Sequence, residues 1–66
     1  MKVFVNDDCV QIAKQSNISQ LLAQLKSPTK GIAIAIGQEI IPASQWDNHL
    51  LNEDDHVLLI RATQGG

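Results

Sequence analysis

Apolar and polar residues alternate along the first twelve residues of the chain with the period of a β-strand. Val3 and Val5 fall on one face of this segment, and Phe4 falls on the other. The run Asn6-Asp7-Asp8 then supplies residues that favour turns, and the alternation resumes over residues 10–12. The opening segment is therefore predicted to be a β-hairpin, with its turn at residues 6–8.

The hydrophobic period changes from two to that of a helix in the next segment. Four apolar residues recur at i, i+3, i+4 and i+7 and form one helical stripe: Ile18, Leu21, Leu22 and Leu25. Asn17 is predicted to be the N-cap, and Gln20 stands where it can complete a capping box. Ser27-Pro28 should stop the helix, since the residue before proline avoids helical angles. We expect one helix of about nine residues.

Short strands are predicted to follow the helix. Residues 32–36 alternate isoleucine with alanine, which places three large side chains on one face and two methyl groups on the other. A tight turn at Gly37-Gln38 leads into a strand at residues 39–41. Ser44 is expected to cap a single helical turn that carries Trp46, and Trp46 is expected to cover one end of the core.

The last predicted strand, residues 56–63, is apolar on both faces over residues 57–60, as expected of a central strand. The predicted order is β-β-α-β-β-β, with one main helix to cover one face of a sheet. This order favours an α+β roll in which a mixed sheet of four to five strands packs on the helix. We expect one domain over residues 1–63 and a flexible C-terminal tail over residues 64–66.

Composition and charge exclude several classes of function. The five basic residues are scattered, the net charge is −2, and only two residues are aromatic, so nucleic-acid binding is not expected. The single cysteine, Cys9, cannot form an internal disulfide and fits a reducing compartment. The longest apolar runs, residues 32–36 and 57–60, are too short to span a membrane. We expect a cytoplasmic protein.

The titratable residues do not form an obvious catalytic or metal site. Cys9 follows two aspartates that oppose ionisation of its thiol, which favours an ordinary strand thiol over a reactive one. His49 and His56 lack ligand-like spacing with Cys9 or with each other. Asp54-Asp55 is more typical of a solvated turn than of an acid–base pair. We therefore expect no metal, no cofactor bound by this chain and no catalytic residues of its own.

The strand pattern also predicts an apolar sheet face that the single helix cannot cover. If the branched residues of the strands face the helix, five residues face the opposite side: Phe4, Ala33, Ala35, Leu58 and Ile60. Such a patch is a candidate partner-binding surface. The alternative is a scatter of exposed apolar residues without a function, which is common on protein surfaces.

The order and spacing of these motifs resemble those of the ubiquitin-like β-grasp family, and within it the sulfur carriers of thiamine biosynthesis. The matching residues run along the whole chain: Asn6-Asp7, Ile18, Leu21-Leu22, Leu25, Ile34-Ala35-Ile36, Ile41-Pro42, Trp46, Asp55 and Gln64-Gly65-Gly66. The chain departs from the carrier pattern at three positions in or beside turns: Gly37, Ser44 and Asp54.

The resemblance implies a function for the C-terminal residues Gln64, Gly65 and Gly66. An E1-like adenylyltransferase would use ATP to activate the carboxylate of Gly66, and a cysteine-derived sulfur donor would convert the acyl-adenylate into a thiocarboxylate. Thiazole synthase would then receive the sulfur. The chain would be a protein co-substrate rather than an enzyme. Two alternatives stay open, a sulfur carrier for molybdopterin synthesis and a ubiquitin-like interaction or conjugation module.

Overall fold

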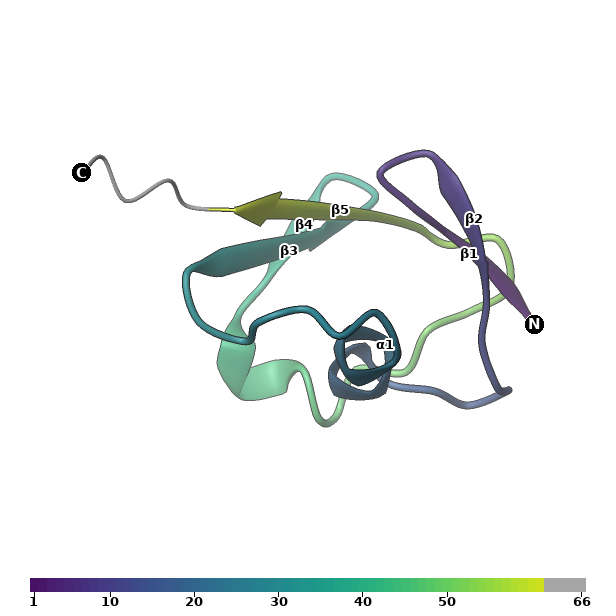
Figure 1. Ribbon diagram of the computed structural model, residues 1–66, viewed down its shortest axis with the longest axis horizontal. Coiled ribbons are helices and arrows are strands. Elements are labelled where there is room, and N and C mark those ends of the chain that lie inside the picture. The colour runs from purple at the N-terminus through teal and green to yellow at the C-terminus, as the bar shows by residue number, and fades with distance from the viewer. Residues whose placement is uncertain (62–66) are drawn as a thin grey trace.

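The computed structural model describes residues 1–61 of the chain. Five strands, one α-helix and one 3₁₀ helix form the fold (Figure 1). In chain order they are β1 (Lys2–Val5), β2 (Asp8–Gln11), α1 (Ile18–Gln24), β3 (Ile32–Ile36), β4 (Glu39–Ile41), η1 (Ala43–Gln45) and β5 (His56–Arg61).

The five strands form one mixed sheet in the order β2-β1-β5-β3-β4. β5 pairs in parallel with β1 and antiparallel with β3, whereas the two outer pairs are antiparallel hairpins. The last strand therefore lies at the centre of the sheet, as its two apolar faces predicted. The α+β roll expected from the element order is confirmed.

The first hairpin closes through a two-residue turn, because Val5 pairs directly with Asp8. Asn6 and Asp7 both have positive φ, 49° and 72°, as a type I′ turn requires. Asparagine and aspartate tolerate these angles better than other residues with a side chain. The predicted turn of three residues was wrong by one, since Asp8 already belongs to β2.

Helix α1 begins as predicted but ends earlier. The Asn17 side chain accepts a hydrogen bond from the backbone of Gln20, and the Gln20 side chain accepts one from the backbone of Asn17, so the capping box is confirmed. At the other end, Lys26 takes a left-handed conformation, with φ 55°. Its N–H bonds the carbonyl of Ala23, and the next N–H bonds that of Leu22, which is a Schellman motif. The helix has seven residues because this motif reverses the chain before Ser27-Pro28.

One hydrophobic core fills the space between the sheet and α1. The helix contributes Ile18, Leu21 and Leu22, all at most 1% exposed. The strands contribute Val3, Val5, Ile34 and Val57, which alternate with outward-facing residues. Each large aliphatic side chain buried in this way stabilises the fold by about 1.5–3 kcal/mol, which matters in so short a chain.

Trp46 closes one end of this core, as expected. Its ring is only 5% exposed, and its Nε1–H donates to the Ile41 carbonyl at 2.9 Å. The predicted cap by Ser44 was wrong. The 3₁₀ turn starts from Pro42, which has no side-chain cap, so Ser44 lies inside the turn. Pro42 is the N-cap and has an extended backbone, with φ −61° and ψ 149°.

Candidate functional site

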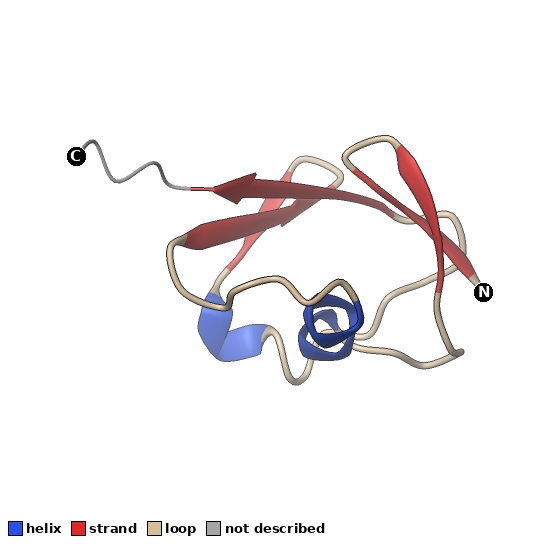
Figure 2. Ribbon diagram, in the orientation of Figure 1, coloured by secondary structure: helices blue, strands red, loops and turns tan. Residues whose placement is uncertain are grey.

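One face of the sheet lies open, opposite the core. Figure 2 shows α1 and η1 on the same side of the sheet, so among residues 1–61 no helix covers the other side. We call this side the outer face. His56, Leu58 and Ile60 of β5 point to it, since they alternate with the core-facing Val57 and Leu59.

The strand register brings four of the predicted surface residues together on the outer face. Ala35 pairs with Leu58, and Ala33 pairs with Ile60, so their side chains project to the same side of neighbouring strands. Leu58 is 49% exposed and Ile60 is 44% exposed. Ala35 is only 6% exposed because the larger side chains around it cover its methyl group. The accessible apolar surface of this group therefore comes mainly from β5.

Phe4, the fifth predicted surface residue, lies on the outer face but is partly covered. Its ring stacks on His56, with centroids 4.8 Å apart and planes 17° apart. The Lys2 ammonium lies 5.4 Å from the centre of the Phe4 ring, within the range of a cation–π interaction. Cys9 pairs with Phe4 across the hairpin and is an exposed free thiol. This corner of the outer face is consequently more polar than the part formed by Leu58 and Ile60.

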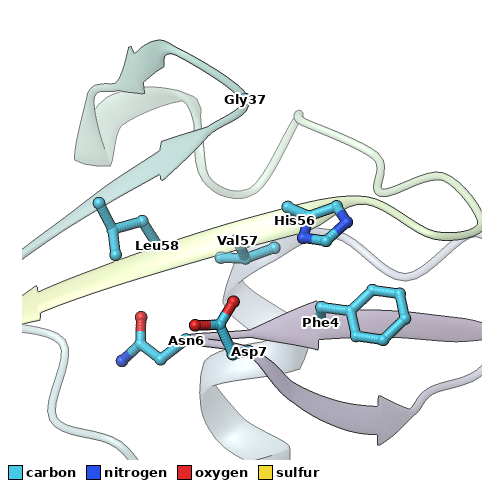
Figure 3. Close-up of a pocket in the computed structure, with 7 residues that line it drawn as sticks. All are labelled: Phe4, Asn6, Asp7, Gly37, His56, Val57 and Leu58. Atoms are coloured by element: carbon cyan, nitrogen blue, oxygen red, sulfur yellow. The ribbon is translucent and has the colours of Figure 1, made fainter.

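A small open pocket of about 190 Å³ lies on the outer face, between the turns of the two hairpins. Figure 3 shows its lining, with Gly37 of the β3–β4 turn on one side and Asn6 and Asp7 of the β1–β2 turn on the other. Phe4, His56, Val57 and Leu58 complete it. Its volume is below that of ordinary small-molecule sites, which start at about 300 Å³. The pocket is therefore too small for an ordinary cofactor.

Residues 1–61 contain no cluster of metal ligands and no helix that could cross a membrane. No three histidine, cysteine, aspartate or glutamate side chains of residues 1–61 gather closely enough to hold a metal ion. In the same range, no helix has the length and apolar character that crossing a membrane requires.

The predicted working residues, Gln64, Gly65 and Gly66, lie outside the described residues, as do the last two residues of the predicted final strand. The structure does describe β5, the strand that precedes them in the chain. β5 runs through the middle of the sheet and ends at Arg61, one residue after Ile60. The exposed apolar residues of the outer face thus stand next to the C-terminal end of this strand.

Comparison with known proteins assigns the chain to a family. The model of the ThiS family matches residues 3–66. This chain belongs to the ThiS family. It is also 36% identical to the sulfur carrier protein ThiS of Escherichia coli strain K12, over 66 residues that make up the whole of both chains.

Solved structures agree with the β-grasp fold of this ThiS-family chain. It is similar to the crystal structure of the thiamine biosynthesis protein ThiS from Geobacter metallireducens, with a TM-score of 0.85, 22% identity and full coverage of both chains. A solution structure of a thiamine biosynthesis protein from the same organism gives a TM-score of 0.79 at 23% identity, covering 100% of this chain and 88% of the other. The resemblance predicted from the sequence is confirmed at the level of family and fold.

Sequence reasoning missed one prominent residue of the outer face in this ThiS-family chain. Ile40 is 63% exposed and pairs with Ala35, so it extends the row formed by Ala35 and Leu58 across three strands. Ile40 and Ile41 are adjacent and chemically identical, and only the register with β3 shows that Ile41 is the buried one. We call Ile40, Leu58 and Ile60 the apolar patch.

Proposed function

We propose that this chain is a sulfur carrier of thiamine biosynthesis, in which the carboxylate of Gly66 is adenylated and converted into a thiocarboxylate that donates sulfur for thiazole formation. The observation that carries the proposal is the full-length similarity to a protein named as a sulfur carrier, together with a family match that extends to residue 66. The chain acts in this proposal as a substrate of other enzymes.

The chemistry explains why an activating partner is needed. A terminal carboxylate is ionised at neutral pH and is a poor acyl donor. A carboxylate oxygen of Gly66 attacks the α-phosphorus of ATP, and pyrophosphate leaves. A sulfur nucleophile then attacks the acyl carbon, and AMP leaves with the C–O bond electrons. Glycine leaves the acyl carbon accessible, because it has no Cβ to crowd the attacking sulfur.

The fold supports delivery of this group to a partner. The five residues after Arg61 can span at most about 18 Å when extended. A partner that holds the domain against its own surface can therefore receive Gly66 in a recessed active site. The apolar patch beside the end of β5 is the proposed docking surface for the E1-like adenylyltransferase and for thiazole synthase.

Incubation of the chain with ATP, the adenylyltransferase of the same organism and sulfide is expected to yield a product in which one oxygen of Gly66 is replaced by sulfur. Intact-mass spectrometry followed by fragmentation would place the exchange at the last residue. The matched control omits ATP and should leave the mass unchanged. An unchanged mass in the complete reaction would refute the proposed function. An isopeptide bond from Gly66 to a lysine would support a conjugation module instead.

Leu58→Asp is expected to weaken docking to the adenylyltransferase without unfolding the domain. Leu58 is 49% exposed, so a charge there stays hydrated in the free protein but must be desolvated against an apolar partner surface. A central interface residue is worth about 2 kcal/mol or more, so KM for the carrier in ATP-dependent adenylation should rise about 30-fold. Leu50→Asp is the control, since Leu50 is 54% exposed but lies in the loop paired with Asn17, away from the outer face. Equal KM values for the two variants would exclude the patch as the docking surface.

A further inference from the structure

The side chain of Asn6 makes two hydrogen bonds to the main chain of Leu59, a residue far away in the sequence. The Leu59 N–H donates to Oδ1 of Asn6 at 2.9 Å, and Nδ2 of Asn6 donates to the Leu59 carbonyl at 3.2 Å. One carboxamide thus satisfies both backbone groups that Leu59 presents toward β1. No other side chain among residues 1–61 contacts the backbone of β5 in this way.

The two bonds continue the parallel β1–β5 ladder beyond the point where β1 ends. In that ladder, the N–H of Phe4 bonds the carbonyl of Asp55 at 2.8 Å, and the N–H of Asn6 bonds that of Val57 at 3.0 Å. The next step would need another strand residue, but the chain turns away at Asn6-Asp7. A carboxamide carries the donor and acceptor of a peptide group, so the Asn6 side chain takes the place of the missing strand.

The Asn6 side chain stabilises the C-terminal end of β5. We call these two bonds the clamp. On its other side Leu59 lies opposite Ile34 of β3, so with the clamp β5 has a neighbour on each side up to two residues before Arg61. Without it, one side of β5 would lose its partner from Leu59 onward. Backbone that lacks partners opens more readily than paired backbone.

We infer that Asn6 is a positioning residue for the C-terminal carboxylate: its clamp on Leu59 sets the direction in which β5 presents the residues that follow Arg61. The inference rests on the proposed function, because it concerns delivery of the group that reacts. A displacement of about 1 Å at a reacting atom can lower a rate about 100-fold, so the direction of the strand end affects the reaction more than the affinity.

Substitutions at Asn6 and at Asp7 can distinguish the effect of the clamp from the effect of the turn geometry. Both residues have positive φ, so glycine at either position keeps the turn geometry without strain. Asn6→Gly removes the two bonds to Leu59, whereas Asp7→Gly removes a side chain for which no hydrogen bond is found among the described residues. A third variant, Asn6→Asp, keeps the size and the acceptor but replaces the donor with an oxygen that faces the Leu59 carbonyl.

The test combines hydrogen exchange of the Leu59 amide with the kinetics of ATP-dependent adenylation by the adenylyltransferase. In Asn6→Gly the Leu59 amide should exchange about fivefold to tenfold faster, and kcat should fall at least about tenfold with KM unchanged. Asn6→Asp should lower kcat in the same direction, and Asp7→Gly should match the wild-type chain in both measurements.

Equal kcat values for Asn6→Gly and Asp7→Gly would overturn the positioning role, as would a change confined to KM, because the clamp does not belong to the docking surface. A wild-type chain that is not adenylated at all would instead refute the proposed function, and the positioning role with it. The two failures are therefore distinguishable in one set of reactions.

Discussion

A chain that lacks Gly66 is expected to accept no measurable sulfur. Deletion moves the terminal carboxylate back by one residue, about 3.3–3.6 Å along an extended chain. A misplacement of about 1 Å already costs about 100-fold in rate, so the loss should be at least that large. Intact-mass spectrometry after reaction with ATP, the adenylyltransferase and sulfide measures it directly. The domain should keep its stability, because residues 1–61 contain the whole hydrophobic core described above.

The matched variant Gly66→Ala distinguishes the effect of chain length from the effect of crowding at the acyl carbon. It keeps the length of the chain and the position of the carboxylate, and it adds only a methyl group beside the acyl carbon. We expect partial sulfur uptake, between that of the wild-type chain and that of the deletion. If the deletion took up sulfur as fast as the wild-type chain, neither the last residue nor its distance from the domain would matter, and Gly66 could not be the carrying residue.

Leu22→Ala should destabilise the domain by about 3–4 kcal/mol. Leu22 is 0% exposed and lies on the core face of α1, where the structure cannot easily fill the space that the lost side chain leaves. Alanine has a high helix propensity, so the loss would come from packing rather than from the helix itself. A domain of this size has a free energy of unfolding of about 3–10 kcal/mol, so the substitution removes a large part of it.

Urea unfolding followed by the fluorescence of Trp46, the single tryptophan, would measure this loss. Trp46 is buried in the same core and should become exposed to solvent in the unfolded chain. Leu50→Ala is the control, because it makes the same chemical change at a side chain that is 54% exposed. It should alter the stability by no more than about 0.5 kcal/mol. Equal losses for the two variants would contradict the assignment of Leu22 to the core.

Features that depend on neighbours in sequence could be predicted well. The capping box of Asn17 and Gln20 forms within one helical turn, and the alternation of Val3 and Val5 follows from the geometry of a strand. The central place of β5 in the sheet was also predicted from its apolar residues on both faces, although Leu58 and Ile60 on the outer face are exposed. The family could be predicted for the same reason, since its motifs are short local patterns in a fixed order.

The errors have a common physical origin in competition between local signals. Asp8 is a residue typical of turns, but the type I′ turn needs only two residues, so pairing with Val5 draws it into the strand. Lys26 is not a usual helix-ending residue, yet it takes the left-handed angles that end α1 before the proline. In both cases a compact hydrogen-bonded motif took precedence over the preference of single residues.

The sequence by itself determined the order of elements, the core-facing residues, the family and the glycines at the C-terminal end. Only the tertiary structure decided which residues lie side by side on the outer face. Ile40 joins Leu58 through the register of three strands, and Asn6 bonds Leu59 across 53 positions of the chain. Periodicity reports the face on which a residue lies, whereas register and strand order come from pairing between distant segments. For this reason the two glycines that end the sequence could be recognised from it, and the contact between Asn6 and Leu59 could not.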